Sequence, residues 1–247
     1  MRTGRPIAVL VAVVALFGCD REPARMTGSV PSFVERTAEP REPSTGRPPL
    51  LVVLHGIGAD EDDLFPIVPL LDPRLKVVSL RAPHSYVMGY AWFHIDFRSD
   101  GTIQPDVGQA KAALSDLVAW VVAAPERHGT DPVQTYLLGF SQGAMMSLGV
   151  LQTAPTRLAG VIALSGRTPS GLFEVTADRD AVARVPLLVA HGTHDDVLPI
   201  ANGRATRDAY EGWSTDFSYH EFPVAHGVTQ DEIRVVADWL RTHLDAS

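Results

Sequence analysis

The chain has 247 residues, of which 45% are hydrophobic and 20% are charged, and its mean hydropathy is +0.05. This composition is typical of a soluble globular protein, and it excludes a disordered chain, a coiled coil and a polytopic membrane protein. The 21 basic and 29 acidic residues give a net charge of −8, which offers no support for binding to nucleic acid or to an anionic membrane. The single cysteine, Cys19, excludes an internal disulfide and a cysteine-based metal cluster.

The first 19 residues have the features of an export signal. Two arginines precede an unbroken apolar run from Ile7 to Phe17, which is too short to span a bilayer. The run ends in LFGC at 16–19, which resembles the site at which bacterial lipoproteins are cleaved and lipidated. We therefore expect residues 1–18 to be a lipoprotein signal peptide. Cys19 is expected to anchor an exported protein by lipid to a bacterial membrane, at the periplasmic face or the cell surface. An ordinary secretory signal is the alternative.

Residues 19–49 are expected to form a tether that follows this signal. The stretch from 20 to 49 contains six prolines and many charges, and it has almost no apolar periodicity. Such a sequence cannot bury enough surface to offset its chain entropy, so we expect it to be extended and mobile. The folded domain is then expected over residues 50–247.

From residue 50 onward, predicted strands and helices alternate. Short apolar runs predict strands at 50–55, 77–80, 136–140, 158–164, 185–191 and 217–222. Amphipathic patterns predict helices at 107–126, 142–152, 200–211 and 232–244. This alternation favours an α/β fold, with a mostly parallel central sheet and helices on both faces. In such sheets, functional residues lie at the carboxyl ends of the strands.

The segment GFSQGA at 139–144 is the most informative motif in the chain. It places G-x-S-x-G between a predicted strand and a predicted helix, which is the context that a nucleophile elbow requires. Gly139 and Gly143 must lack side chains so that the strand and the helix can pack around a tight turn. Ser141 would then present its hydroxyl at a helix N-terminus, where the helix dipole favours a developing anion.

A catalytic serine needs a base, and that base needs an acid to orient it. In folds of this kind, the three residues follow in the chain order serine, acid, histidine. Asp195 comes directly after the predicted strand at 185–191, and His226 comes after the predicted strand at 217–222. Both residues therefore stand on loops at strand ends, in the required order.

Two backbone amides are expected to form an oxyanion hole. One is the N–H of Gln142, which directly follows the serine. The other is the N–H of Ile57, in the glycine-containing loop HGIG at 55–58 that follows the first predicted strand. His55 is expected to stabilise this loop and not to react. These groups predict acyl transfer at a serine nucleophile, which needs neither a metal nor a cofactor.

These motifs resemble the phospholipase/carboxylesterase family of α/β-hydrolases, which includes acyl-protein thioesterases and small bacterial carboxylesterases. The matching segments are LHGIG at 54–58, RAP at 81–83, AWF at 91–93, GFSQGA at 139–144, HGTHDDVLP at 191–199 and AHG at 225–227. The resemblance spans residues 50–240 and implies an α/β-hydrolase fold. No insertion is long enough to be a separate lid domain. The resemblance also implies a serine hydrolase that cleaves carboxylic esters or thioesters through Ser141, His226 and Asp195.

The family pattern assigns the acid to the residue three positions after the glycine of the HG pair, which is Asp195. The sequence departs from the pattern on both sides of this residue. Thr193 stands where the family usually has an acidic residue, and Asp196 stands where it usually has proline. Two adjacent aspartates therefore compete for the role, and Asp196 is the alternative acid.

Apolar side chains near the expected site predict an acyl-binding groove for a small-molecule ester or acyl substrate. Trp92 and Phe93 lie in a loop after the second predicted strand, and Leu172 and Phe173 follow the fourth. Since the same residue types also fill protein cores, a packing role is the alternative for them.

Other functions remain open from the sequence alone. A serine peptidase or a polysaccharide esterase, such as an acetyl or feruloyl esterase, would use the same three residues. The alternative from another class is a surface-anchored binding module that kept the fold without activity. Such a module is expected to have lost Ser141, Asp195 or His226, and all three are present. A zinc site is disfavoured, because no HExxH-like helix is found. The oligomeric state is not predicted.

Overall fold

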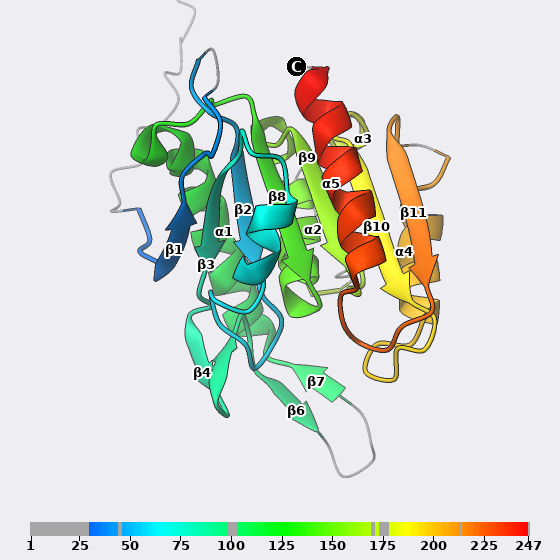
Figure 1. The fold of residues 1–247 in the computed structure, drawn as a ribbon. Coiled ribbons are helices and arrows are strands. Elements are labelled where there is room, and N and C mark those ends of the chain that lie inside the picture. The colour runs from blue at the N-terminus through cyan, green and yellow to red at the C-terminus, as the bar shows by residue number, and fades with distance from the viewer. Residues whose placement is uncertain are drawn as a thin grey trace, which may run out of the picture.

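A seven-stranded sheet forms the centre of the molecule, in the strand order β1-β3-β2-β8-β9-β10-β11 (Figure 1). The structure is a computed structural model that describes residues 30–43, 46–97, 103–168, 171–172, 178–212 and 214–246. The strands are β1 (Glu35–Ala38), β2 (Leu50–Leu54), β3 (Lys76–Leu80), β8 (Thr135–Phe140), β9 (Gly160–Leu164), β10 (Leu187–Gly192) and β11 (Phe217–Phe222). All neighbours run parallel except β1, which is antiparallel to β3. The predicted mostly parallel sheet is confirmed.

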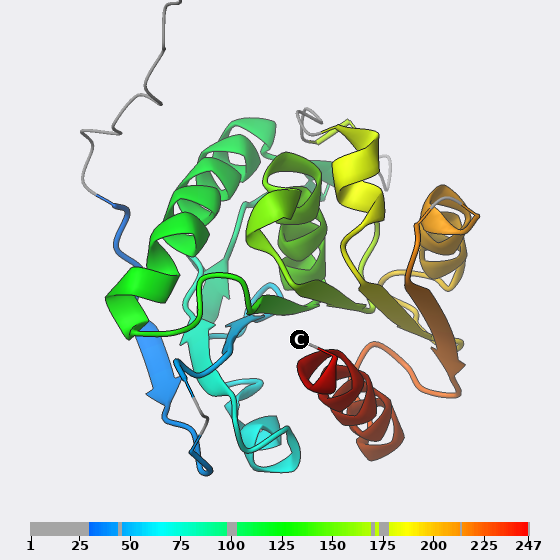
Figure 2. The same cartoon turned by 90° about the horizontal axis from the view of Figure 1, so that it is seen from above.

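Helices cover both faces of this sheet, as Figure 2 shows. One face carries α1 (Val107–His128), α2 (Gln142–Thr153), α3 (Arg179–Ala183) and α4 (Ala201–Tyr210). The other face carries the short helix η1 (Phe65–Leu70) and the C-terminal helix α5 (Gln230–Asp245). A single turn, η2 (Pro155–Arg157), joins α2 to β9. By length and composition alone α1 could cross a membrane, but its Leu117 and Trp120 are fully buried in the core.

The side chains of β2 explain why the core has two layers. Leu50, Val52 and Leu54 pack into the cluster that contains α1 and α2. Leu51 and Val53 point the other way, into the cluster that contains η1 and α5. Successive strand residues point to opposite faces, so a strand covered on both sides must be apolar throughout. This is why the uninterrupted apolar runs in the sequence predicted these strands correctly.

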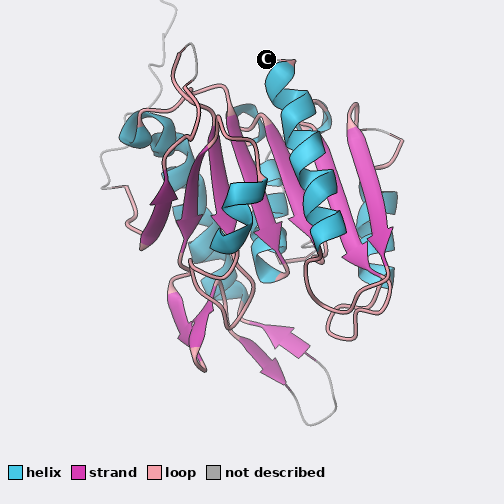
Figure 3. Cartoon of the chain, viewed as in Figure 1, coloured by secondary structure: helices cyan, strands magenta, loops and turns pink. Residues whose placement is uncertain are grey.

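Two small hairpins lie apart from the main sheet (Figure 3). In one, β4 (His84–Tyr86) pairs with β5 (Gly89–Ala91), and in the other, β6 (Ile95–Phe97) pairs with β7 (Ile103–Pro105). Figure 1 places both at the end of the sheet where the loops after β10 and β11 also lie. The sequence predicts only a loop here, because three-residue strands are too short to show a period.

Strand β1 corrects the predicted domain boundary at residue 50. Its four residues pair with β3, from Glu35 opposite Leu80 to Ala38 opposite Val77. The sequence ERTA has no apolar alternation, because its residues stay exposed or only half-buried, so periodicity misses it. The expectation of a mobile tether is therefore wrong for residues 35–38, which belong to the folded domain. Cys19 and the signal-peptide region lie outside the described residues.

The sheet changes its direction of growth between β2 and β8. From β2 the chain continues to β3 on one side, whereas β8 is followed by β9, β10 and β11 on the other. At such a switch point, the connections leave a crevice at the carboxyl ends of the strands, where α/β proteins bind ligands. Leu54 pairs with Gly139, so the loop after β2 and the turn after β8 emerge side by side at this switch point.

Candidate active site

The turn between β8 and α2 holds Ser141 in a strained backbone conformation, with φ of 54° and ψ of −114°. A Cβ on Gly139 would lie 2.3 Å from the carbonyl oxygen of Gly143, and a Cβ on Gly143 would lie 2.1 Å from that of Leu54. Backbone atoms cannot move aside as a flexible side chain can, so both positions need glycine. The Ser141 N–H donates to Leu164 O of the neighbouring strand, at 2.9 Å. These contacts hold the serine at the N-terminus of α2.

Ser141, His226 and Asp195 form a continuous chain of hydrogen bonds. His226 Nε2 lies 2.9 Å from Ser141 Oγ. The other ring nitrogen of His226, Nδ1, lies 2.7 Å from Asp195 Oδ2. Because a carboxylate only accepts, Nδ1 carries the proton and Nε2 is free to accept the serine proton. The structure thus brings together three residues from three different loops, with the histidine in the tautomer of a general base.

The structure places Asp195, and not Asp196, beside the histidine. The Asp195 side chain has no exposed surface, and its Oδ1 accepts hydrogen bonds from the backbone N–H groups of Val197 at 3.0 Å and Leu198 at 2.7 Å. These bonds fix the carboxylate so that Oδ2 faces His226. Asp196 is exposed to solvent. Hydrogen bonds to a buried carboxylate also stabilise its charge, which an orienting acid requires.

Backbone contacts bring the acid loop and the histidine loop together. Thr193 N–H donates to Phe222 O at 2.7 Å, and His194 N–H donates to Val224 O at 3.0 Å. A Cβ on Gly192 would lie 2.4 Å from Val224 O, so the two loops can approach this closely only because residue 192 is glycine. The spacing between Asp195 and His226 is therefore set by the parallel pair β10 and β11.

The loop after β2 lies against the serine turn. A Cβ on Gly56 would lie 3.3 Å from Ser141 Cβ. The two amides predicted as oxyanion donors, Ile57 N–H and Gln142 N–H, belong to this loop and to the first residue of α2, respectively. Neither amide donates a hydrogen bond to any group in the described part of the chain. Both segments that carry the predicted donors therefore lie next to the nucleophile, at the helix end that favours negative charge.

His55 has a structural place in this loop, as expected. Its Nε2 accepts from Ala82 N–H at 3.0 Å, which leaves Nδ1 to donate to Gly56 O at 2.7 Å. The side chain is fully buried, and burial lowers the pKa of the imidazole below its usual value. A neutral ring is what both bonds require. Since Gly56 O and Ile57 N–H belong to one peptide plane, the histidine also fixes the direction of that N–H.

The structure corrects the prediction that Trp92 and Phe93 contact a substrate. Their exposed fractions are 0% and 2%, so both side chains lie inside the core. The indole N–H of Trp92 donates to His55 O at 3.0 Å. Leu172 is also buried, at 4% exposure, and Phe173 lies outside the described residues. The alternative, a packing role, therefore fits Trp92, Phe93 and Leu172, because a buried side chain cannot contact a ligand.

The side chain of Gln142 joins two distant segments, a role that no motif in the sequence indicates. Its Oε1 accepts from Trp92 N–H and its Nε2 donates to Phe93 O, both at 2.7 Å. The partners are about fifty positions apart in the chain, and they use backbone atoms that any residue has. No pattern in the sequence could have revealed this pair of bonds.

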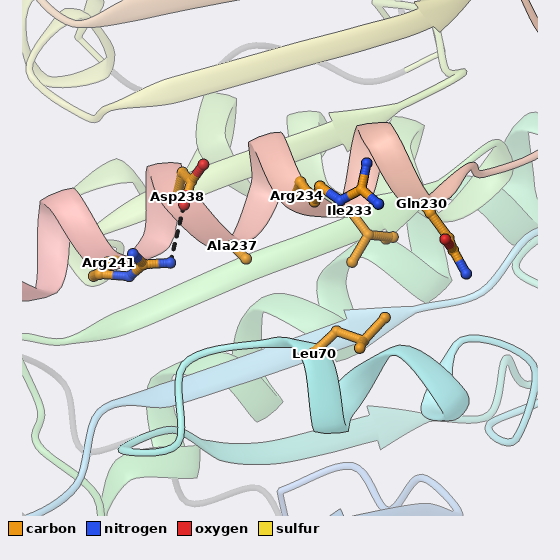
Figure 4. Close-up of a pocket in the computed structure, with 7 residues that line it drawn as sticks. All are labelled: Leu70, Gln230, Ile233, Arg234, Ala237, Asp238 and Arg241. Carbon is orange, nitrogen blue, oxygen red and sulfur yellow. Dashed lines mark hydrogen bonds and ion pairs between the residues drawn. The ribbon is translucent and has the colours of Figure 1, made fainter.

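A separate groove of about 410 Å³ lies between α5 and η1 (Figure 4). Its lining includes Leu70 and Ile233, and Arg241 within it is paired with Asp238 at 2.9 Å. None of the predicted site residues lines this groove.

In the ranges that the structure describes, no three His, Cys, Asp or Glu side chains converge as a metal site would require. The hydrogen-bonded group of Ser141, His226 and Asp195 is the candidate active site.

Comparison with known proteins gives consistent matches. A family model described as phospholipase/carboxylesterase matches residues 35–244, beginning at the first residue of β1. The chain is 27% identical over 208 residues to a probable carboxylesterase of Oryza sativa subsp. japonica, which covers 78% of this chain and 77% of the relative. It is 25% identical over 163 residues to acyl-protein thioesterase 1 of Debaryomyces hansenii, which covers 65% and 70%. The crystal structure of esterase PE8 is similar with a TM-score of 0.73 and 29% identity, over 85% of this chain and 98% of that one.

Proposed function

Because the chain belongs to the phospholipase/carboxylesterase family of carboxylesterase- and thioesterase-type hydrolases, we propose that it hydrolyses small carboxylic esters or thioesters through Ser141, His226 and Asp195. The observation that carries the proposal is the unbroken chain of hydrogen bonds from Ser141 Oγ through His226 to Asp195 Oδ2. It provides a nucleophile, a base in the correct tautomer and a buried acid that orients the base.

In the first half of the reaction, Ser141 Oγ attacks the carbonyl carbon of the substrate while its proton passes to His226 Nε2. The carbonyl oxygen becomes an oxyanion, which the N–H groups of Ile57 and Gln142 stabilise. The intermediate then collapses. The bond to the leaving alcohol or thiol breaks, His226 gives its proton to that group, and the acyl group remains on Ser141. The Asp195 carboxylate stabilises the imidazolium throughout and keeps its own charge.

In the second half, water takes the place of the serine hydroxyl as nucleophile. His226 Nε2 accepts a proton from water as the water oxygen attacks the acyl carbon. A second oxyanion forms in the same hole, the bond between Ser141 Oγ and the acyl carbon breaks, and His226 returns the proton to Oγ. The product is a carboxylic acid. Every proton transfer uses a side chain present at the site, so no metal or cofactor enters the scheme.

A labelling and turnover experiment tests this proposal. A fluorophosphonate probe should label the wild-type protein and leave Ser141→Ala unlabelled, because labelling needs an activated serine. Purified protein should hydrolyse p-nitrophenyl esters from acetate to octanoate or the matching thioesters, and Ser141→Ala should lose at least about 10³-fold in kcat/KM. Parallel assays on a peptide p-nitroanilide, an acetylated polysaccharide and a feruloyl ester test the other serine hydrolases. An unlabelled, inactive wild-type protein would refute the proposal in favour of a binding module.

We propose in addition that the chain is exported and held to a bacterial membrane by lipid on Cys19. The support is the sequence LFGC at the end of an eleven-residue apolar run from Ile7 to Phe17. A lipidated cysteine with three acyl chains gives much firmer attachment than one chain. The full-length protein should partition into detergent, whereas Cys19→Ser should persist as an unprocessed precursor. A Cys19→Ser protein that is processed to a soluble form would leave only an ordinary secretory signal.

A further inference from the structure

Trp92 is bonded to both segments that carry the proposed oxyanion donors. Its indole N–H donates to His55 O at 3.0 Å, and His55 immediately precedes the Gly56–Ile57 peptide. Its backbone N–H donates to the side chain of Gln142 at 2.7 Å, and the backbone N–H of Gln142 is the other donor. One fully buried residue thus links the loop after β2 to the start of α2.

The link to Gln142 has two bonds that act together. Oε1 of the amide accepts from Trp92 N–H and Nε2 donates to Phe93 O, so the side chain is held at both of its polar atoms. Gln142 is 4% exposed. Because a buried amide bonded at both ends cannot rotate freely, the position of α2's first residue follows the position of the Trp92–Phe93 backbone.

The strand that leads into Trp92 is itself attached to the loop after β2. Tyr90 O accepts from Gly58 N–H, and Tyr90 N–H donates to Ala59 O, each at 2.8 Å. A Cβ on Gly89 would lie 2.2 Å from Gly58 O, so the two backbones are in direct contact. The segment 89–93 therefore forms a brace that runs along the oxyanion loop and ends at the serine turn.

We infer that Trp92 is a positioning residue for the oxyanion hole, and this inference rests on the proposed function. The two donors stand on connections that follow the paired strands β2 and β8. The pairing brings the connections together, and contacts beyond the strand ends must set the exact separation of the two amides. Effective donors must lie about 2.7–3.1 Å from the oxyanion, and a misplacement of about 1 Å can cost roughly 10²-fold in rate. The bonds from Trp92 fix that separation before substrate arrives. Trp92 acts without touching the substrate.

Trp92→Phe tests the inference, because it keeps a buried aromatic ring and removes the indole N–H that reaches His55 O. We expect kcat to fall by about 10- to 100-fold while KM changes less than about threefold, since the donors act on the transition state. Trp120→Phe is the matched control. It also removes a buried indole N–H bond, to Glu35 Oε1 at 3.0 Å, but at the edge strand β1, three strands away from β8. Its kcat should stay within about twofold of wild type.

A second readout separates positioning from general loosening of the fold. A trifluoromethyl ketone forms a tetrahedral adduct with an activated serine, and its affinity depends on the oxyanion hole. Its inhibition constant should rise in Trp92→Phe by the same factor by which kcat falls, and stay unchanged in Trp120→Phe. Thermal unfolding of both variants shows whether they are equally folded. Equal kcat losses in the two variants, or an unchanged inhibition constant in Trp92→Phe, would overturn the inference.

Gln142→Met tests the same brace from its other end and decides the matter if Trp92→Phe does not fold. It keeps the backbone N–H of residue 142 and removes both side-chain bonds. We expect a similar loss in kcat, and a double variant that loses less than the product of the single losses, because both changes release one geometry. An unchanged kcat in Gln142→Met would contradict the brace. If the wild-type protein is neither labelled nor active, the proposed function has failed; if it is active and only these variants behave as wild type, only this inference has failed.

Discussion

Two serines at the ends of neighbouring strands share a positive φ and differ in the hydrogen-bond partners of their hydroxyl groups. Ser141 follows β8 and Ser165 follows β9, with φ of 54° and 46°. Each donates its N–H to the last part of the next strand, Ser141 to Leu164 O at 2.9 Å and Ser165 to Ala190 O at 2.8 Å. Both are buried, at 5% and 0% exposure. Of the two, Ser141 has a histidine beside its Oγ, with His226 Nε2 at 2.9 Å. Within the described chain, Ser165 Oγ has no hydrogen-bond partner.

The difference shows that strain at a strand end does not by itself give a serine the hydrogen-bond partners that a nucleophile needs. A positive φ on a non-glycine residue is often found at functional sites, but the parallel sheet produces it twice here. A serine hydroxyl needs a base that takes its proton, and the base needs a fixed acid. At Ser141 the loops after β11 and β10 place a histidine and an aspartate in one hydrogen-bonded chain, whereas Ser165 Oγ has no hydrogen-bond partner in the part of the chain that the structure describes. The positions of the loops after β10 and β11 therefore determine which of the two serines has a histidine partner.

The largest effect should come from removing the base. We expect His226→Ala to lower kcat/KM for p-nitrophenyl esters by about 10³-fold or more, because Ser141 then has no group to accept its proton. Ser165→Ala should stay within about twofold of wild type and keep full labelling by a fluorophosphonate. Steady-state kinetics and labelling of the two variants check this. A comparable loss in Ser165→Ala would mean that the second serine takes part in the reaction.

A smaller loss in kcat should distinguish Asp195 from Asp196 as the acid. Asp195→Asn keeps the size of the side chain but favours the wrong histidine tautomer, and we expect a loss in kcat of roughly 10²- to 10³-fold. Asp196→Asn should lose less than about threefold, because Asp196 is exposed and is not bonded to His226. Both variants should unfold at similar temperatures if the acid acts in catalysis. The opposite ranking in kcat would reassign the acid to Asp196.

The smallest effect concerns Glu232, at the start of the helix that follows His226. Its backbone N–H and side chain complete a capping box with Thr229, yet the residue is only 1% exposed and Oε1 has no partner in the described chain. Burial raises the pKa of the Glu232 carboxyl from 4.5 to about 7, and the bond from Thr229 N–H opposes this rise. The native state therefore keeps a proton that the unfolded chain has already lost between these pH values.

Stability should consequently fall as pH rises from 4.5 to about 7, and then stay level. The fall can reach about 3 kcal/mol, since each unit of pKa difference corresponds to about 1.4 kcal/mol. Glu232→Gln keeps a capping side chain and cannot titrate. Urea unfolding at pH 5 and pH 8 should show that the wild type loses more stability over this range than the variant. An equal loss in both would show that Glu232 is already ionised in the native state at pH 5.

The sequence predicted those strands and helices whose burial leaves a local apolar pattern in the chain. The strands at 50–54 and 135–140 are buried on both faces, so each reads as an apolar run, and the amphipathic helices differ from prediction by at most two residues at an end. The turn around Ser141 could also be predicted from its motif. Gly139 is required by Gly143 and Ala144, which are near in the chain, but Gly143 is required by Leu54 on a distant segment. The structure brings Ser141, His226 and Asp195 into one hydrogen-bonded chain. It thereby places Asp195, and not Asp196, beside the histidine, a choice that the sequence alone left open.

Other features were decided only by the tertiary structure. Strand β1 forms because β3 offers a free edge, and the four residues of β1 have no apolar pattern of their own. Trp92 is of a residue type that often contacts ligands, but in this structure it lies in the core. Its bonds reach His55 and Gln142, which are 37 and 50 positions away in the chain. A local pattern records which side chains a segment must bury. It does not record which backbone atoms of a distant segment will accept a hydrogen bond, and in this protein those long-range bonds set the geometry around the nucleophile.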